Sequence, residues 1–169
     1  TQTLWYHRLT METLVTIERA IEIARQAATI QTTESVFLTE AHNRILSQDL
    51  TSKVDDPPFD NSAMDGWAVR SSDHERVEIG TTAAGSPPAK LGEGEAIRIM
   101  TGAPVPKGAD AIVLIEDGLE GKAHTNFIRY QGENLSKGSV ALRAGQVMTP
   151  SAISLAATMG HATIPVRVK

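Results

Sequence analysis

Short apolar runs separated by proline, glycine and aspartate fill the chain from Thr51 to about Ser136, and this pattern most limits its fold. The runs VEIG, EAIRIM and DAIVLIE are long enough for β-strands but too short for ordinary helices. Proline fixes φ and glycine admits backbone angles closed to other residues, so the segments between the runs favour tight turns. We therefore predict a β-rich region of short strands and tight loops.

Helical patterns lie on both sides of this region. Near the N-terminus an amphipathic helix is predicted, with Thr16 as its N-cap and an apolar stripe formed by Leu14, Ile17, Ile21, Ala24 and Ala28. After it, SVFLT is typical of a strand and TEAHN of one helical turn, with Asn43 in the left-handed conformation. Near the C-terminus, Thr149 as N-cap, Pro150 in the first helical position and Gly160 beyond the last turn predict a helix, and alternating residues then predict a final strand.

The simplest topology that accommodates these elements is a mainly β chain with some helix, of the α+β class. We expect an N-terminal helical segment over residues 1–32, and a small mixed α/β lobe formed by residues 33–51 and 139–169. Residues 52–138 would form a β-rich lobe inserted into the mixed lobe.

Composition excludes several classes of function. A net charge of −4 without long runs offers no basic surface for nucleic acid, and no apolar run approaches the roughly 20 residues that span a bilayer, so we expect neither partner. The chain has no cysteine, and its first residues lack the order of a secretory signal, which predicts a cytoplasmic protein. The five histidines, at positions 7, 42, 74, 124 and 161, show no spacing typical of metal ligands.

Two segments carry residues suited to chemistry. In PPFDNSAMDGWAV, residues 57–69, the polar side chains either satisfy backbone N–H groups of a tight turn or belong to a rigid loop that holds a carboxylate. In RIMTGAPVPKGADAIV, residues 98–113, Thr101 and Gly102 follow a strand and either begin a long hairpin loop or offer a hydroxyl and backbone N–H groups to a phosphate. Together the two loops suggest Mg²⁺ bound next to a phosphate.

These two segments resemble the signature segments of the MoeA family, the molybdopterin molybdenumtransferases that include the E domain of gephyrin. The stretches LTEAHNRILSQDL and GENLSKGSVALRAGQVMTPSAISLAATMGHATIPV are also similar to family segments, in the same order. The resemblance covers only the family's N-terminal region, which has a small mixed lobe with an inserted β lobe. In such proteins an α/β domain, on which the leading helix packs, and a β-barrel follow.

The resemblance implies a reaction in which molybdate, a substrate, is inserted into adenylated molybdopterin with Mg²⁺-dependent release of AMP. It implies a homodimer, supplied by an upstream molybdopterin adenylyltransferase, with the site completed by the α/β domain, so we expect no activity from this chain alone. Asp65 is the first candidate for a catalytic or Mg²⁺-binding carboxylate. Ser62, Thr101, Gly102 and Arg129 are the candidates for substrate contacts.

Near the segment GEN, residues 132–134, this chain departs from the family pattern at two positions. The family usually has Asp where this chain has the candidate catalytic residue Asn134, and Asn where this chain has Phe127. An amide lacks the charge that Mg²⁺ or a proton transfer would use. The alternative function is therefore a noncatalytic module of the same fold, used for dimerisation or for docking a partner.

Overall fold

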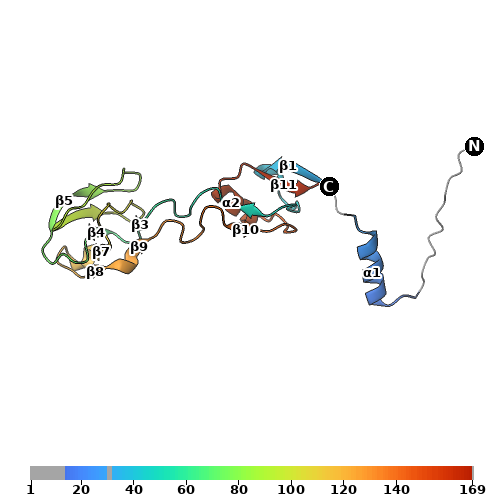
Figure 1. The fold of residues 1–169 in the computed structure, drawn as a ribbon, viewed down its shortest axis with the longest axis horizontal. Coiled ribbons are helices and arrows are strands. Elements are labelled where there is room, and N and C mark those ends of the chain that lie inside the picture. Colours follow the sequence, from blue (N-terminus) through green and yellow to red (C-terminus); the bar gives the residue numbers. More distant parts are fainter. Residues whose placement is uncertain (1–13, 30–31, 169) are drawn as a thin grey trace, which may run out of the picture.

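The computed structural model describes residues 14–29 and 32–168 of the chain (Figure 1). Parts of the predicted N-terminal segment, namely residues 1–13 and 30–31, and with them His7, lie outside the described residues. The helices are α1 (Ile17–Ala27) and α2 (Pro150–Thr158), and the short 3₁₀ turns are η1 (Leu38–Glu40), η2 (Ile115–Asp117) and η3 (Thr125–Phe127). The strands are β1 (Thr33–Phe37), β2 (Leu50–Thr51), β3 (Asn61–Ser62), β4 (Gly66–Val69), β5 (Val77–Thr82), β6 (Glu95–Ile99), β7 (Ala111–Leu114), β8 (Ala123–His124), β9 (Ile128–Arg129), β10 (Val140–Leu142) and β11 (Thr163–Arg167). Few helices and several small sheets confirm the predicted α+β class.

The predicted β-rich region contains a five-stranded sheet in the order β5-β6-β4-β7-β8. Strand β4 is central and antiparallel to both neighbours, whereas β5 runs parallel to β6. Successive side chains of a strand point to opposite faces, so Trp67 and Val69 belong to one apolar cluster and Ala68, between them, to another. The sheet therefore has a core on each face.

Residues 33–51 and 140–167 share a separate core. Strand β1 pairs antiparallel with β11, and β10 with β2. Helix α2 begins as predicted, since the Thr149 hydroxyl accepts a hydrogen bond from the Ala152 N–H at 3.3 Å and Pro150 stands in its first turn. Asn43 has the predicted left-handed backbone, with φ of 60°. The buried apolar residues of this core are Val36, Ala41, Leu46, Leu50, Leu142, Met148, Ala156, Met159, Ile164 and Val166.

Two connecting segments, residues 52–60 and 131–138, run side by side between these two regions (Figure 1). Backbone hydrogen bonds join them, including Asp56 N–H to the Leu135 carbonyl and Gly132 N–H to the Pro57 carbonyl, both at 2.9 Å. The connection is thus a paired ribbon of backbone. The predicted boundaries at residues 51/52 and 138/139, close to the ends of this ribbon, stay a prediction.

Helix α1 forms as predicted but buries none of its residues. Thr16 caps it by accepting a hydrogen bond from the Arg19 N–H at 3.3 Å. Ile17 is 76% exposed and Ile21 45%, so the apolar stripe has no cover from the rest of the described chain. Within residues 14–29 and 32–168, neither helix has the length and apolar character needed to cross a membrane.

Candidate functional site

Strand β3 brings the two candidate segments together. Its residues Asn61 and Ser62 pair with Arg129 and Ile128 of β9. On its other side, the Ser62 N–H donates to the Ala103 carbonyl at 3.1 Å, and the Ser62 carbonyl accepts from the Gly102 N–H at 2.8 Å. The loop before β4 and the loop after β6 are therefore fixed to one another through the backbone of Ser62.

Asp65 and Thr101 form the centre of the first group of polar residues, which we call the Asp65 cluster (Ser62, Asp65, Thr101, Gly102). One carboxylate oxygen of Asp65, Oδ1, accepts the Thr101 N–H at 2.7 Å and the Thr101 hydroxyl at 2.8 Å. The backbone N–H of Thr101, then its hydroxyl, hold the pKa of the Asp65 carboxyl below its ordinary value, because both stabilise the charged form. The other oxygen, Oδ2, accepts no hydrogen bond from the described part of the chain, and the residue is exposed.

Local hydrogen bonds shape the loops of the Asp65 cluster. The buried Ser62 hydroxyl donates to the Met64 carbonyl at 2.6 Å, which bends the chain just before Asp65. Gly102 has φ of 79°, a left-handed conformation that glycine adopts without steric cost. The tight-turn interpretation also holds for part of this segment, since the Ser62 hydroxyl accepts the Met64 N–H at 3.3 Å.

Arg129 organises a second group, which we call the Arg129 cluster (Asp56, Arg129, Glu133, Asn134). Its Nε lies 2.7 Å from Oε1 of Glu133, and its NH2 donates to Oδ1 of Asn134 at 3.0 Å. Nδ2 of Asn134 donates in turn to Oδ2 of Asp56 at 3.0 Å. The hydrogen bond from Arg129, and next that from the Tyr130 N–H, lower the pKa of the Glu133 carboxyl.

The structure thus places all six predicted site residues in two clusters, joined by the β3–β9 pairing. Sequence reasoning did not single out Asp56 or Glu133. Glu133 lies within the GEN segment, four residues after Arg129, but Asp56 stands 78 residues before Asn134. No local signal in the sequence reports a contact over that separation.

The backbone donors predicted for a phosphate are engaged within the chain. Thr101 N–H bonds to Asp65, and Gly102 N–H to the Ser62 carbonyl. The physical reason is that the neighbouring carboxylate and carbonyl are acceptors already in place. Contact between this loop and a phosphate would therefore depend on the Thr101 hydroxyl, which can turn about a single bond.

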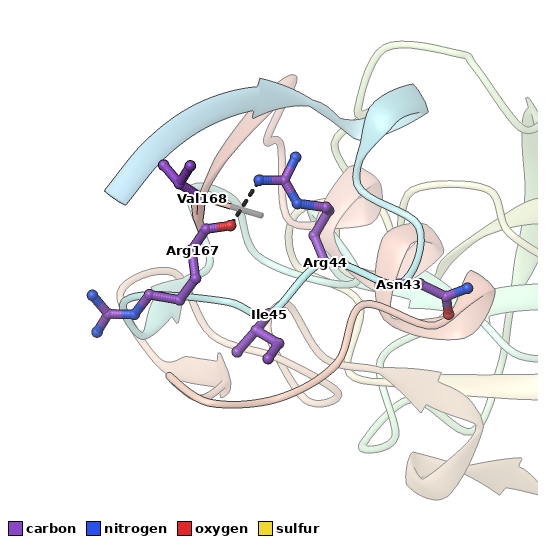
Figure 2. A pocket seen from close by; sticks show the side chains of 5 residues that line it. All are labelled: Asn43, Arg44, Ile45, Arg167 and Val168. Carbon is purple, nitrogen blue, oxygen red and sulfur yellow. Dashed lines mark hydrogen bonds between the residues drawn. The ribbon is translucent and has the colours of Figure 1, made fainter. Parts of the chain in front are cut away.

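Two other polar arrangements have structural explanations. A shallow pocket is lined by Asn43, Arg44, Ile45, Arg167 and Val168 (Figure 2). There the buried Arg44 guanidinium donates to the Glu34 carboxylate and, at 2.7 Å, to the Arg167 carbonyl, which ties the Arg44 segment to β1 and β11.

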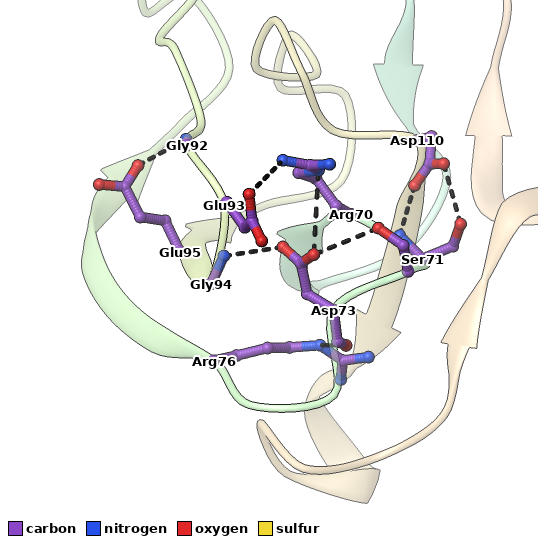
Figure 3. Close-up of polar contacts among 10 residues, drawn as sticks. Arg70, Ser71, Asp73, Arg76, Gly92, Glu93, Gly94, Glu95 and Asp110 are labelled. Carbon is purple, nitrogen blue, oxygen red and sulfur yellow. Dashed lines mark hydrogen bonds and ion pairs between the residues drawn. The ribbon is translucent and has the colours of Figure 1, made fainter.

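The second arrangement surrounds Asp73 (Figure 3). Its carboxylate accepts the Gly94 N–H at 2.8 Å and lies 3.9 Å from Nε of Arg70. Arg76 donates to the Asp73 carbonyl at 3.0 Å. These contacts fasten the turn before β5 to the turn before β6.

No group of three or more His, Cys, Asp or Glu side chains that could hold a metal ion occurs among residues 14–29 and 32–168. A metal at Asp65 would therefore need ligands from outside these side chains. This requirement suits Mg²⁺, which proteins usually bind through one or two carboxylates together with substrate phosphates and water.

Residues 15–160 match the family model described as the MoeA N-terminal region (domain I and II), and the chain therefore belongs to the MoeA family.

Named relatives agree with this membership. The chain is 40% identical over 153 residues to the molybdopterin molybdenumtransferase of Synechococcus elongatus, with 79% of this chain and 38% of that protein covered. It is 37% identical over 172 residues to the enzyme of that name from Staphylococcus aureus, with 90% and 41% covered. The chain thus spans about two-fifths of the length of these relatives.

Solved structures share the fold. A crystal structure of the molybdopterin biosynthesis MoeA protein of Pyrococcus horikoshii aligns with a TM-score of 0.79 at 30% identity, covering 92% of this chain and 44% of that one. A second structure of the protein aligns with a TM-score of 0.74 at 34% identity, covering 83% and 42%.

Proposed function

We propose that this chain is the N-terminal part of a molybdenum cofactor biosynthesis enzyme that inserts molybdate into adenylated molybdopterin, with Mg²⁺-dependent release of AMP. The observation that carries the proposal is the Asp65 cluster. An exposed carboxylate is held by Thr101 through Oδ1, while Oδ2 is left for a ligand. The names of the relatives, molybdopterin molybdenumtransferase, supply the substrate class.

Mg²⁺ fits the Asp65 cluster by its chemistry. It prefers oxygen ligands, and the Thr101 hydrogen bonds that lower the pKa of the Asp65 carboxyl favour its charged form. When bound, the ion would neutralise charge on the phosphates of the adenylate. The chain's own contribution is to hold Asp65 in one orientation, which the two bonds from Thr101 and the backbone contacts of Ser62 achieve.

In the proposal Arg129 binds the anionic part of the substrate. Its guanidinium has five N–H donors, of which those on Nε and NH2 contact Glu133 and Asn134. The donors that remain can bind a phosphate, and the side chain is 43% exposed. Asn134, predicted as a catalytic residue, cannot serve as a proton-transferring carboxylate, so it enters the proposal through its contact with Arg129.

The remaining parts of the proposal concern the whole protein. The whole protein works as a homodimer whose α/β domain supplies the rest of the site. An upstream molybdopterin adenylyltransferase delivers the substrate in the cytoplasm. These parts rest on the family resemblance. The exposed apolar stripe of α1 is consistent with a covering domain that lies outside the chain described here.

The test is a calorimetric titration of adenylated molybdopterin into the full-length dimer, with and without Mg²⁺. Asp65→Asn removes the charge and keeps the shape. Glu93→Gln is the matched control, because Glu93 is 85% exposed and lies in the turn before β6, away from both clusters. We expect Mg²⁺-dependent binding in the wild type and the control, and weaker binding in Asp65→Asn. A folded dimer that binds no ligand would refute the proposal.

A second candidate function, a noncatalytic module for dimerisation or partner docking, is favoured by the same stripe on α1. Ile17→Ser with Ile21→Ser would disrupt that function without touching either cluster. If dimerisation of the full-length protein were lost while the purified wild type released no AMP, the module would be the better explanation.

A further inference from the structure

We propose that Asp56 is a positioning residue of the candidate site. The Asp56 carboxylate requires a hydrogen-bond donor at position 134, which the Asn134 amide supplies. Through that amide, Asp56 holds the guanidinium of Arg129 in place. The positioning role rests on the proposed function, because it concerns the group that binds the substrate anion there. The pairing of Asp56 with Asn134 stands on the geometry alone.

The side chain of Asn134 uses both ends of its amide. The carbonyl end accepts from Arg129 NH2 and the amino end donates to Oδ2 of Asp56, each at 3.0 Å. Among the side chains of this size, an amide alone supplies a donor and an acceptor at these two positions. An aspartate would accept from Arg129 but would face Asp56 with a second negative charge. The partners on either side therefore specify asparagine.

The backbone holds Asp56 and Asn134 opposite one another. The Asn134 and Leu135 N–H groups both donate to the Asp56 carbonyl, at 2.9 and 3.1 Å, and the Asp56 N–H donates back to the Leu135 carbonyl at 2.9 Å. The ribbon that joins the two regions of the chain therefore keeps the two side chains within reach of one another. A substitution that prevents the two side chains from bonding would consequently disturb the ribbon or the contact of residue 134 with Arg129.

Arg129 transmits the effect toward the Asp65 cluster. It pairs with Asn61 in the β3–β9 ladder, and the next residue of β3, Ser62, binds the Gly102 N–H through its carbonyl. Glu133 holds the guanidinium on its Nε side and Asn134 on its NH2 side. These two contacts fix the orientation of the guanidinium, so its remaining donors point in one direction. A preorganised anion-binding group requires such a fixed orientation.

The charged groups near the pair include Arg129, Glu133, Asp55 and Lys137. Arg129 lies on one side of Asn134, and Glu133 neutralises much of its charge. Asp55, next to Asp56, is engaged separately by the Lys137 N–H at 2.7 Å and by the Gln131 side chain at 2.8 Å. Asp56 therefore has Asn134 as its side-chain partner within the part of the chain that the structure describes.

The test is a double-mutant cycle of Asp56→Asn and Asn134→Asp. In Asn134→Asp alone, the new carboxylate faces that of Asp56. It has no hydrogen to donate and carries a like charge, so the hydrogen bond is lost. In the double variant the amide and the carboxylate have exchanged places, so the hydrogen bond between them and the contact with Arg129 both re-form. A structural role and a positioning role are separated by two readouts, the thermal midpoint of this chain and the affinity of the full-length dimer for adenylated molybdopterin.

We expect Asn134→Asp to lower the thermal midpoint by about 2–4 °C. We expect it to weaken ligand binding by about tenfold, as losing the orientation of one charged contact would. The double variant should recover both, to within about threefold in affinity and about 1 °C in midpoint, because the exchanged pair re-forms the same contacts. The effects of independent substitutions would instead simply add.

Three results would count against the inference, and each is distinct. If Asn134→Asp changes the midpoint equally in the wild type and in the Asp56→Asn variant, the pair is not coupled and the inference fails. If the midpoint recovers in the double variant but affinity does not, Asp56 has only a structural role. If the wild-type dimer binds no ligand, the proposed function fails and the positioning role fails with it, while the midpoints still decide the pairing.

Discussion

Gly66, directly after Asp65, is the position where a single added methyl group should be most damaging to the site. A Cβ at this residue would lie 1.9 Å from the Val113 carbonyl oxygen and 3.2 Å from Cα of Leu114. Both atoms belong to the backbone of β7, which pairs with β4 at this point, so neither can move without parting the two strands. Forcing extra volume into a packed interior costs typically about 1–3 kcal/mol, and a clash with paired backbone belongs at or above the upper end.

We therefore expect Gly66→Ala to lower the free energy of unfolding by about 3 kcal/mol or more. For a chain of this length that corresponds to a fall of about 6–12 °C in the thermal midpoint. The assay is urea unfolding followed by circular dichroism, with the midpoint and the slope both measured. Contact between Asp65 and Thr101 should weaken in the same variant, because the Asp65 carbonyl accepts the Ile115 N–H at 3.1 Å beside the disturbed pairing.

Gly80→Ala is the matched control. Gly80 also lies in the five-stranded sheet, but an added Cβ there would have no atom within 4 Å. We expect its free energy of unfolding to stay within about 0.5 kcal/mol of the wild type. Equal stabilities for the two variants would refute the argument that close backbone approach is the reason for glycine before Trp67.

Three further outcomes are expected. Thr101→Val should raise the pKa of the Asp65 carboxyl part of the way toward its ordinary value, since the backbone N–H of residue 101 remains. A carboxyl-carbon NMR titration would measure this pKa, and an unchanged value would contradict the role of the hydroxyl. Because the folded pKa is lowered, this contact stabilises the fold above the unfolded pKa, and its contribution is lost as pH falls through the folded pKa. Thr149→Ala should cost about 1 kcal/mol through loss of the N-cap, measured by urea unfolding, with Thr158→Ala as a comparison at the other end of the helix. Leu46→Ala, at a fully buried position, should cost about 2–5 kcal/mol in the same assay, and a loss under about 1 kcal/mol would mean that the site is not closely packed.

The elements that the sequence predicted correctly are those encoded by neighbouring residues. Helix α2 carries its own signals, with Thr149 and Pro150 at its start and Gly160 beyond its end. The runs VEIG, EAIRIM and DAIVLIE became β5, β6 and β7 because each is a short apolar run bounded by turn residues. Asn43 took the left-handed conformation that its place after a helical turn indicates.

Pairing between distant segments could not be predicted in the same way. Nothing within VEIG indicates that β5 would run parallel to β6 when the other pairs of the sheet are antiparallel. The bond of Asp65 to Thr101 spans 36 residues, and that of Asn134 to Asp56 spans 78. The family resemblance indicated Asp65 and Thr101, but the partner of Asn134 became visible only when the two connecting segments were seen side by side.

Release of AMP by the full-length dimer is the decisive test of whether the carboxylate of Asp65 serves Mg²⁺-dependent chemistry on an adenylate. The measurement supplies adenylated molybdopterin, molybdate and Mg²⁺ to the wild type, Asp65→Asn and the exposed control Glu93→Gln. We predict release of AMP that depends on Mg²⁺, is unchanged in the control, and falls by about 100-fold or more in Asp65→Asn. Equal rates for Asp65→Asn and the wild type, or no AMP from a folded wild-type dimer, would rule out this role of Asp65.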